Sequence, residues 1–458
     1  MHNLSFLVLH RLVGLETLPY FALVLATHLL NVALMFDACR RLGVSLAVAG
    51  LASLLWGTSP VHQESMRWFT AYGAVLGTTF ALIALREIAG SIGAQRSMRP
   101  RELAIAVAAL LLGAATVGGG GVVALVFPLV TLLALPSRGA PLRTSAIFGA
   151  VAVVVLVLSH LLGQRGTPST LGDVAAAYAA LFAYGAGTMV AGPLVTVSAG
   201  AIGPFSGVEP DVAVGIGGVL AAVVFAFAAV AFLRRGGRER ALILGLLVLP
   251  AAQYVAVAWA RTGFRGPNSV AWLATHSRYH YCETALLLIA LAVTLGKRDG
   301  TREMAWPRRS RVIAGGAIWV AASFWVSSRA SVPASEGTAA TMSSLSANIR
   351  AAARQLPVGA TLYLRNDFFR PVYDLRLIGV PRTEFPNIGA YWVIDHGTQP
   401  FEGRMIRFVE RDAAAAAAVR ASSIADVGAL FVPPEEVTRE GGVVRGLAEL
   451  EAPEARAP

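Results

Sequence analysis

Long apolar runs follow one another through the first 329 residues, and they constrain the fold more than any other feature of the chain. They cover residues 18–36, 44–58, 70–86, 102–117, 121–136, 143–162, 212–233, 241–260, 279–296 and 311–328. A helix of about 20 apolar residues is long enough to cross the hydrocarbon core of a bilayer. The pattern therefore predicts an all-α polytopic membrane bundle with about 10–12 membrane helices.

The composition agrees with a membrane protein and excludes several other classes. Hydrophobic residues make up 55% of the chain and charged residues only 14%, whereas a soluble domain carries about 25% charged residues. The net charge of +11 does not point to nucleic acid, because the bases lie in short loops between apolar runs. Residues 1–329 hold 25 bases and 12 acids, while residues 330–458 hold 13 bases and 15 acids. We expect the lipid bilayer, and no nucleic acid, as a partner.

The arginines predict the orientation of the helices. Five loops carry 18 of the 25 bases in residues 1–329, and the positive-inside rule places such loops in the cytoplasm. They lie at 40–41, 86–101, 138–143, 234–240 and 297–311. All five can be cytoplasmic only if the stretch 174–203 enters and leaves on one side, so we expect a broken hairpin there. The alternative is a plain helix at 174–203 with an exceptional loop elsewhere.

The chain divides into four parts on this reading. Residues 1–329 form the membrane domain, 330–345 a linker rich in Ser, Ala and Thr, and 346–443 a small α/β or β-rich exoplasmic domain. The last residues, 444–458, are expected to be a disordered tail. We place the protein in the cytoplasmic (inner) membrane of a bacterium, with the C-terminal domain outside.

An early polar cluster at a predicted membrane face is the first candidate site. A helix with His28 and Asn31 leads through a basic turn into a second apolar helix, which ends in an exoplasmic loop. That loop holds His62, Glu64, Arg67 and Trp68. Ionisable groups at membrane depth are functional candidates: His62 and Glu64 could share a proton or hold a metal, and Arg67 could hold a phosphate. The alternative is an interfacial loop with Trp in the aromatic belt.

A later cluster lies where an exoplasmic loop enters a helix. His276, Arg278 and Tyr279 precede the helix, and Glu283 lies one turn inside it. These cations and the helix N-terminus could hold an anionic headgroup, although Arg snorkelling and Tyr anchoring explain the same residues. Asp173 is a further exoplasmic candidate whose spacing is not specific. The two cysteines form no CxxC motif, so we expect no zinc site.

At these two clusters the sequence resembles the integral-membrane glycosyltransferases of the GT-C superfamily. The closest likeness is to the protein O-mannosyltransferase-like branch that includes the transmembrane-and-TPR proteins. That branch has an H-x-x-N helix, a basic turn and a helix ending in H-P-x-H-x-E-x-V-x-W, which here correspond to His28–Asn31 and Ser59–Trp68. Its late E-R-Y-x-Y run corresponds to Ser277–Tyr281. The chain starts at what resembles the end of the family's acidic loop, so we expect the first helix and that loop to be missing.

The resemblance implies an inverting transferase with an exoplasmic active site. It would move a sugar from a polyprenyl-phosphate donor to a glycan, lipid or protein acceptor. Glu64 and His62 would be catalytic, while Arg278, Arg67, His276 and Tyr279 would bind the donor phosphate. His28, Asn31, Trp68, Asp173 and Glu283 are further candidates. No cofactor is certain, and a divalent metal is one alternative. The alternative functions are a transporter or flippase of a lipid-linked intermediate, and a catalytically degenerate GT-C-fold scaffold.

Overall fold

The computed structural model describes the membrane part of the chain nearly throughout and short pieces of the remainder. The described residues are 2–13, 17–62, 65–66, 69–116, 118–136, 141–162, 170–199, 210–262, 270–296, 314–325, 350, 353–354, 358, 361–365, 401–403, 405–409, 424–426, 438–440 and 443–445. They separate into two units, which we describe individually. The first comprises residues 1–2 and 18–330, and the second comprises residues 3–17 and 331–458.

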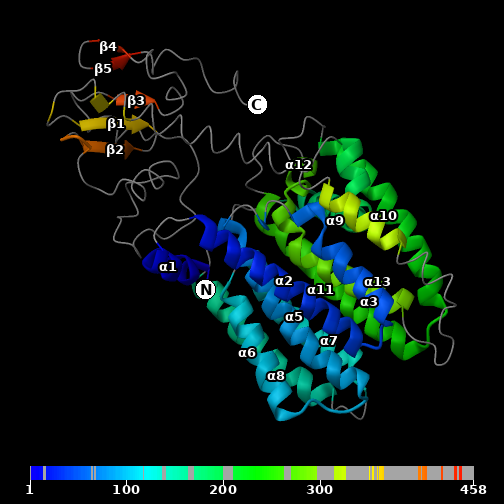
Figure 1. Ribbon diagram of the computed structural model, residues 1–458. Coiled ribbons are helices and arrows are strands. Elements are labelled where there is room, and N and C mark those ends of the chain that lie inside the picture. Colours follow the sequence, from blue (N-terminus) through cyan, green and yellow to red (C-terminus); the bar gives the residue numbers. More distant parts are fainter. Residues whose placement is uncertain are drawn as a thin grey trace. The chain divides into compact units, whose positions relative to one another are not determined.

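Each of the ten predicted apolar runs forms a helix (Figure 1). These helices are α2 (Thr17–Arg41), α3 (Leu46–Gly57), α5 (Tyr72–Gly93), α6 (Pro100–Ala114), α7 (Gly118–Ala134), α8 (Pro141–Leu162), α10 (Pro210–Leu233), α11 (Gly237–Arg261), α13 (Tyr281–Gly296) and Ala314–Trp325. Among the described residues, five helices are both long and apolar enough to cross a membrane: α2, α5, α8 from Pro141 to Leu158, α10 and α11. The predicted all-α bundle is confirmed, while 10–12 crossings stays a prediction.

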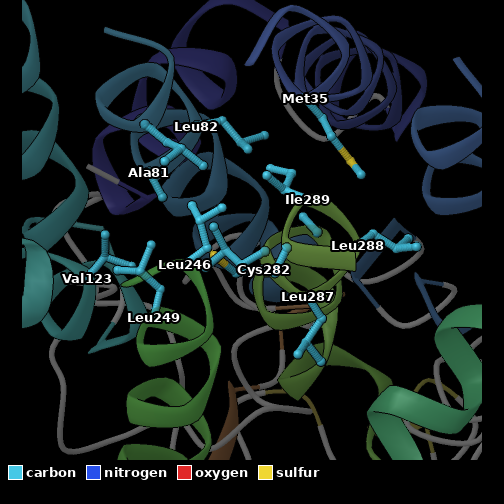
Figure 2. Close-up of a cluster of buried hydrophobic side chains, with 14 of the residues drawn as sticks. Met35, Ala81, Leu82, Val123, Leu246, Leu249, Cys282, Leu287, Leu288 and Ile289 are labelled. Carbon is cyan, nitrogen blue, oxygen red and sulfur yellow. The ribbon is translucent and has the colours of Figure 1, made fainter. Parts of the chain in front are cut away.

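The core of the bundle forms where α13 lies between other helices. Figure 2 shows Met35 of α2, Leu82 of α5 and Leu246 of α11 in one cluster with Ile289 of α13, while Val123 of α7 lies beside Leu249 of α11; all of these side chains are buried. The helix α13 is buried along almost its whole length. The outer helices expose large apolar side chains instead, as expected for surfaces that face lipid.

The predicted broken hairpin at 174–203 is wrong. Residues 174–199 belong to one continuous helix, α9 (Leu171–Ala199), and 200–203 lie outside the described residues. Gly185 and Gly187 do not interrupt this helix. They lie where neighbouring helices pack closely against it. A side chain at Gly187 would overlap the backbone of Gly217 in α10, and one at Gly185 would overlap Tyr254 of α11. Small residues let helices approach closely where no hydrophobic driving force holds them together.

The helices α9 and α10 run antiparallel. Gly187 packs against Gly217, while the Phe182 ring lies 5.4 Å from the Phe225 ring. The later residue of α10 therefore lies beside the earlier residue of α9. In this register, Leu171 at the start of α9 lies beside the C-terminal end of α10.

The basic loops gather at one end of the bundle, which we call the arginine end. There Ser45 donates from its backbone to the Gly296 carbonyl at 3.1 Å, and Arg235 donates to the Thr294 carbonyl at 2.7 and 3.2 Å. Arg238 donates to the Gln95 side chain. The described residues of 40–41, 86–101 and 234–240 therefore share one end, as the positive-inside rule requires, while residues 297–311 lie outside the described part.

The second unit contains one helix and short strands. Helix α1 (His2–Val13) precedes three strands that form a parallel sheet in the order β2-β1-β3, where β1 is Thr361–Arg365, β2 Met405–Val409 and β3 Ile424–Asp426. Thr361 pairs with Met405, and Tyr363 pairs with Ile424. Two further strands, β4 (Thr438–Glu440) and β5 (Val443–Arg445), pair antiparallel.

These short strands do not establish the predicted domain at 346–443. The predicted strands at 360–364 and 405–409 coincide with β1 and β2. The third predicted strand, at 391–394, and the predicted helix at 413–418 lie outside the described residues. A small α/β or β-rich domain therefore stays a prediction.

Candidate functional site

The early and late clusters meet at the end of the bundle opposite the arginine end, where α3 ends and α13 begins. His28, in the middle of α2, links both. Its Nδ1 lies 2.6 Å from the Tyr281 hydroxyl of α13, and its Nε2 lies 2.8 Å from the Gly57 carbonyl of α3. A carbonyl only accepts, so Nε2 carries the proton and Nδ1 of the neutral ring accepts from Tyr281. We call this region the histidine end.

Asn31 and Trp56 fix the position of Tyr281 from two sides. Asn31 Nδ2 donates to the Val75 carbonyl at 3.0 Å and lies 3.4 Å from the Tyr281 hydroxyl. Trp56 Nε1 donates to the Tyr281 carbonyl at 3.2 Å. All of these groups are buried, and a buried polar group that is hydrogen-bonded avoids a desolvation penalty of about 1–3 kcal/mol. The network therefore holds the start of α13 against α2 and α3.

His62 completes a box of four rings. It lies in the short η1 helix (Pro60–His62), and its ring centroid is 4.8 Å from that of Tyr281, 4.9 Å from that of Trp56 and 5.8 Å from that of His28. Neither ring nitrogen of His62 forms a hydrogen bond to another described residue. The backbone carbonyl of Trp56 raises the pKa of His62, but burial lowers it by more.

The protonation state of His62 follows from its burial. The side chain is almost completely enclosed. Burial, followed by the neighbouring His28, lowers the pKa of His62 well below its usual value of 6.5. His62 is therefore neutral at pH 7, so one of its nitrogens has a lone pair that can accept a proton from a hydroxyl.

A second histidine repeats the arrangement of His28. His280, between η5 (Ser277–Tyr279) and α13, directs Nε2 at the Ala274 carbonyl at 2.6 Å and Nδ1 at the Tyr254 hydroxyl at 3.0 Å. Burial lowers the pKa of His280 to about 4. Gly185 of α9 makes room for this pair, because a side chain there would overlap both Tyr254 and His280. The helix α9, which was expected to be broken, thus supports the site.

Two cations flank one tyrosine beside these buried histidines. The Arg278 guanidinium lies 4.9 Å from the centroid of the Tyr279 ring, and Arg278 Nη2 donates to the Tyr279 hydroxyl at 3.3 Å. The Arg261 guanidinium, from the last turn of α11, lies 5.9 Å from the same centroid. The His276 ring stacks on Tyr279 at 5.9 Å. Arg278 is half-buried and Arg261 exposed, so both can meet an anion that approaches from outside.

The remaining described candidates have different positions. Glu283 is buried in the first turn of α13. Asp173 accepts from the Thr170 hydroxyl at 2.7 Å, and its backbone amide donates to that hydroxyl at 3.1 Å, which caps the start of α9. Since α9 starts at the arginine end, the structure does not bring Asp173 to the histidine end, as the predicted hairpin would have done.

Three predicted residues, Glu64, Arg67 and Trp68, lie outside the described residues. The described His62 and Met66 lie close to them along the chain. Within the described ranges, no three His, Cys, Asp or Glu side chains come together as metal ligands would.

Sequence reasoning overlooked Arg261, Tyr254 and Tyr184. Arg261 ends an apolar run, which is the ordinary place of a snorkelling cation, so the sequence alone offers no reason to select it. Tyr254 and Tyr184 lie inside apolar runs and are completely buried. Only their proximity to His280, at 5.6 and 5.4 Å between ring centroids, marks them.

No family model, no curated protein and no solved structure matches this chain.

Proposed function

We propose that the protein is a membrane glycosyltransferase of the GT-C type, which transfers a sugar from a polyprenyl-phosphate donor to a glycan, lipid or protein acceptor. The reaction would take place at the histidine end, which faces the exoplasm if the arginine end is cytoplasmic. The bacterial inner membrane as location, and an exoplasmic C-terminal domain, are parts of the same proposal.

One observation carries the proposal. His28 and His62 on one side and Tyr281 on the other are more than 200 positions apart in the sequence, yet their rings form one buried box. The two stretches that hold them are the two that resemble GT-C motifs. A cationic rim of Arg278 and Arg261 adjoins the same helix start. Proton-accepting groups beside cations are what sugar transfer from a phosphate requires.

The chemistry can be divided among these residues. The acceptor hydroxyl attacks the anomeric carbon of the donor sugar, and the bond from that carbon to the phosphate oxygen breaks. The hydroxyl proton passes to Glu64, with His62 beside it. The polyprenyl phosphate leaves with one more negative charge, and Arg278 stabilises that charge together with Arg261. Attack from the face opposite the phosphate inverts the anomeric carbon.

The alternative of a transporter or flippase has lost the feature that favoured it. A discontinuous helix often lines a transport site, and the stretch 174–203 was the candidate. The helix α9 is continuous there. The alternative of a degenerate GT-C-fold scaffold predicts that the wild-type chain transfers no sugar.

The test is a transfer assay with the full-length chain in liposomes. Labelled polyprenyl-phosphate sugars serve as donors and bacterial membrane extracts as acceptors. We expect Glu64→Gln and His62→Asn to reduce turnover by about 10²-fold or more, because each removes a proton-accepting group. Arg278→Gln should raise the KM for the donor as well as reduce turnover.

Arg143→Gln is the matched control, because Arg143 is an exposed arginine at the arginine end. Its turnover should equal that of the wild-type chain. If Glu64→Gln and His62→Asn keep full turnover, these residues take no part in the reaction. If the wild-type chain transfers no sugar from any donor, the scaffold alternative replaces the proposal.

A further inference from the structure

A cavity of about 720 Å³ opens at the arginine end, remote from the histidine end. The ends of α5, α7, α10 and α11 form it. Its polar residues are Gln95, Arg234, Arg235, Arg238 and Glu239. Its apolar wall comes from Ile92, Ala134, Ala231 and Leu242. A cavity of this size and mixed lining is typical of a binding site for a small amphipathic molecule.

The charge of the cavity is not balanced by its own residues. Three arginines line it against one glutamate, which leaves a charge of +2. Glu239 lies 3.8 Å from Arg235, so it is already paired. Among the described residues, Arg238 bonds to the neutral Gln95 and Arg234 forms no ion pair. The two guanidiniums of Arg234 and Arg238 are therefore available to an anion.

The start of α11 adds to the positive potential. Its N-cap residue, Gly236, has extended backbone angles and provides no side-chain hydrogen bond to the first turn. A side chain at Gly236 or Gly237 would meet no atom within 4 Å. The positive end of the helix dipole thus faces open space between the arginines, which favours a negative group there.

An apolar stripe leads along α10 to this cavity. Val223, Phe227 and Val230 are 51, 71 and 51% exposed and recur at spacings of four and three residues. Arg234 follows four residues after Val230 and so lies on the same face of the helix. An acyl chain could lie along this stripe while its headgroup reaches the arginines.

We propose that this cavity binds the phosphate of an anionic phospholipid from the adjacent leaflet. Arg234 and Arg238 hold the phosphate oxygens, and the apolar stripe of α10 holds an acyl chain. Basic pockets between membrane helices recognise anionic headgroups in this way. The site is independent of the proposed transfer reaction, since it lies at the opposite end of the bundle.

The test measures lipid binding to the purified full-length chain in detergent by native mass spectrometry. The probes are dioleoyl phosphatidylglycerol, dioleoyl phosphatidylcholine and inorganic phosphate. We expect phosphatidylglycerol to bind at least about tenfold more tightly than phosphatidylcholine. Removing both charges in R234Q/R238Q should weaken phosphatidylglycerol binding by about 25-fold, because each arginine near a membrane surface contributes roughly fivefold. Arg143→Gln should bind like the wild-type chain.

Gly236→Asp separates loss of the site from loss of the fold. Asp is a favourable N-cap and should preserve or slightly increase thermal stability, while its charge should weaken phosphatidylglycerol binding. Equal affinity for both lipids, or unchanged binding by R234Q/R238Q, would overturn the proposal. Displacement of phosphatidylglycerol by an equal concentration of inorganic phosphate would assign the cavity to a free phosphate instead.

Discussion

At the scale of single residues, the histidine end is organised by neutral imidazoles that each bridge a backbone carbonyl and a tyrosine hydroxyl. His28 does this with Gly57 and Tyr281, and His280 with Ala274 and Tyr254. His62 has no such bridge to described residues. A buried imidazole whose nitrogens are already bonded is held in place, whereas one with an unbonded nitrogen can exchange a proton. In the proposed transfer reaction, we therefore expect His28 and His280 to position the site and His62 to exchange the proton.

Replacing Tyr281 by Phe tests the positioning role. The change removes one hydroxyl and leaves the Nδ1 of His28 without its donor, so we expect a loss of stability of about 1 kcal/mol. A double-mutant cycle with His28→Ala, measured by thermal unfolding in detergent, should give a coupling energy of similar size. A coupling near zero would show that the 2.6 Å contact contributes nothing to stability.

The buried histidines also predict how stability depends on pH. Their folded pKa values lie below 6.5, so between pH 6.5 and the folded values the unfolded chain binds more protons than the folded chain. The stability that these two histidines contribute is therefore complete above pH 6.5 and decreases as the pH falls below it, by up to about 1.4 kcal/mol per pH unit for each histidine.

The measurement is the melting temperature in detergent between pH 8 and pH 5. Between pH 6.5 and pH 5 the melting temperature of the wild-type chain should fall more steeply than that of His62→Gln. A slope that His62→Gln leaves unchanged would mean that His62 binds a proton in the folded protein.

Two features of the histidine end, the box of rings and Arg261, could not be predicted fully from the sequence. His28 and His62 were selected as polar groups in apolar surroundings, whereas Tyr281 only ended the late motif. Their common box depends on the packing of α2, α3 and α13. Arg261 was missed because a cation at a helix end has an ordinary explanation. Arg261 becomes a candidate because it lies close to Tyr279, and this contact is visible only in the folded structure.

At the scale of helices, apolar runs were sufficient to predict nearly every element. The short helix α12 (Val270–Ala274) and helix α1 were not predicted, and the stretch 174–203, with its glycines and a proline, was predicted to be a broken hairpin, although Leu171–Ala199 form the continuous helix α9. The glycines instead lie at contacts, where Gly187 meets Gly217 and Gly185 meets Tyr254. A sequence does not distinguish a glycine that bends a helix from one that admits a neighbouring backbone.

A pair of alanine substitutions tests this explanation. Gly187→Ala should destabilise the protein by about 1–3 kcal/mol, because a methyl group would overlap the α10 backbone. Gly215→Ala is the matched control on α10, since a side chain there meets no atom within 4 Å. It should be neutral or stabilise by up to about 1 kcal/mol through helix propensity. Equal effects of the two substitutions on the thermal unfolding curve would contradict the α9–α10 packing.

At the scale of the whole molecule, the bundle has two chemically different ends. The arginine end carries guanidiniums and a basic cavity, and the histidine end carries buried rings with a cationic rim. The sequence predicted the cytoplasmic loops from charge alone. It placed Asp173 at the other end, because the parity argument depended on a hairpin, whereas Leu171–Ala199 form one helix.

Cysteine labelling in membrane vesicles checks the arrangement of the two ends. Single cysteines at Thr170 and Arg238 should react with an impermeant maleimide from the same side, and a cysteine at Arg278 should react from the other. The native Cys39 and Cys282 are buried, so they contribute little background. Labelling of Thr170→Cys together with Arg278→Cys from one side would contradict the orientation of α9.

The most direct test of the central claim is photo-crosslinking with a polyprenyl phosphate that carries a diazirine next to its phosphate. After irradiation of the full-length chain in liposomes, labelled peptides are identified by mass spectrometry. We expect labels both between residues 60 and 72 and between residues 276 and 281, and unlabelled polyprenyl phosphate should compete them away. Labels confined to one of these stretches, or found only at the arginine end, would show that the two clusters do not form one site.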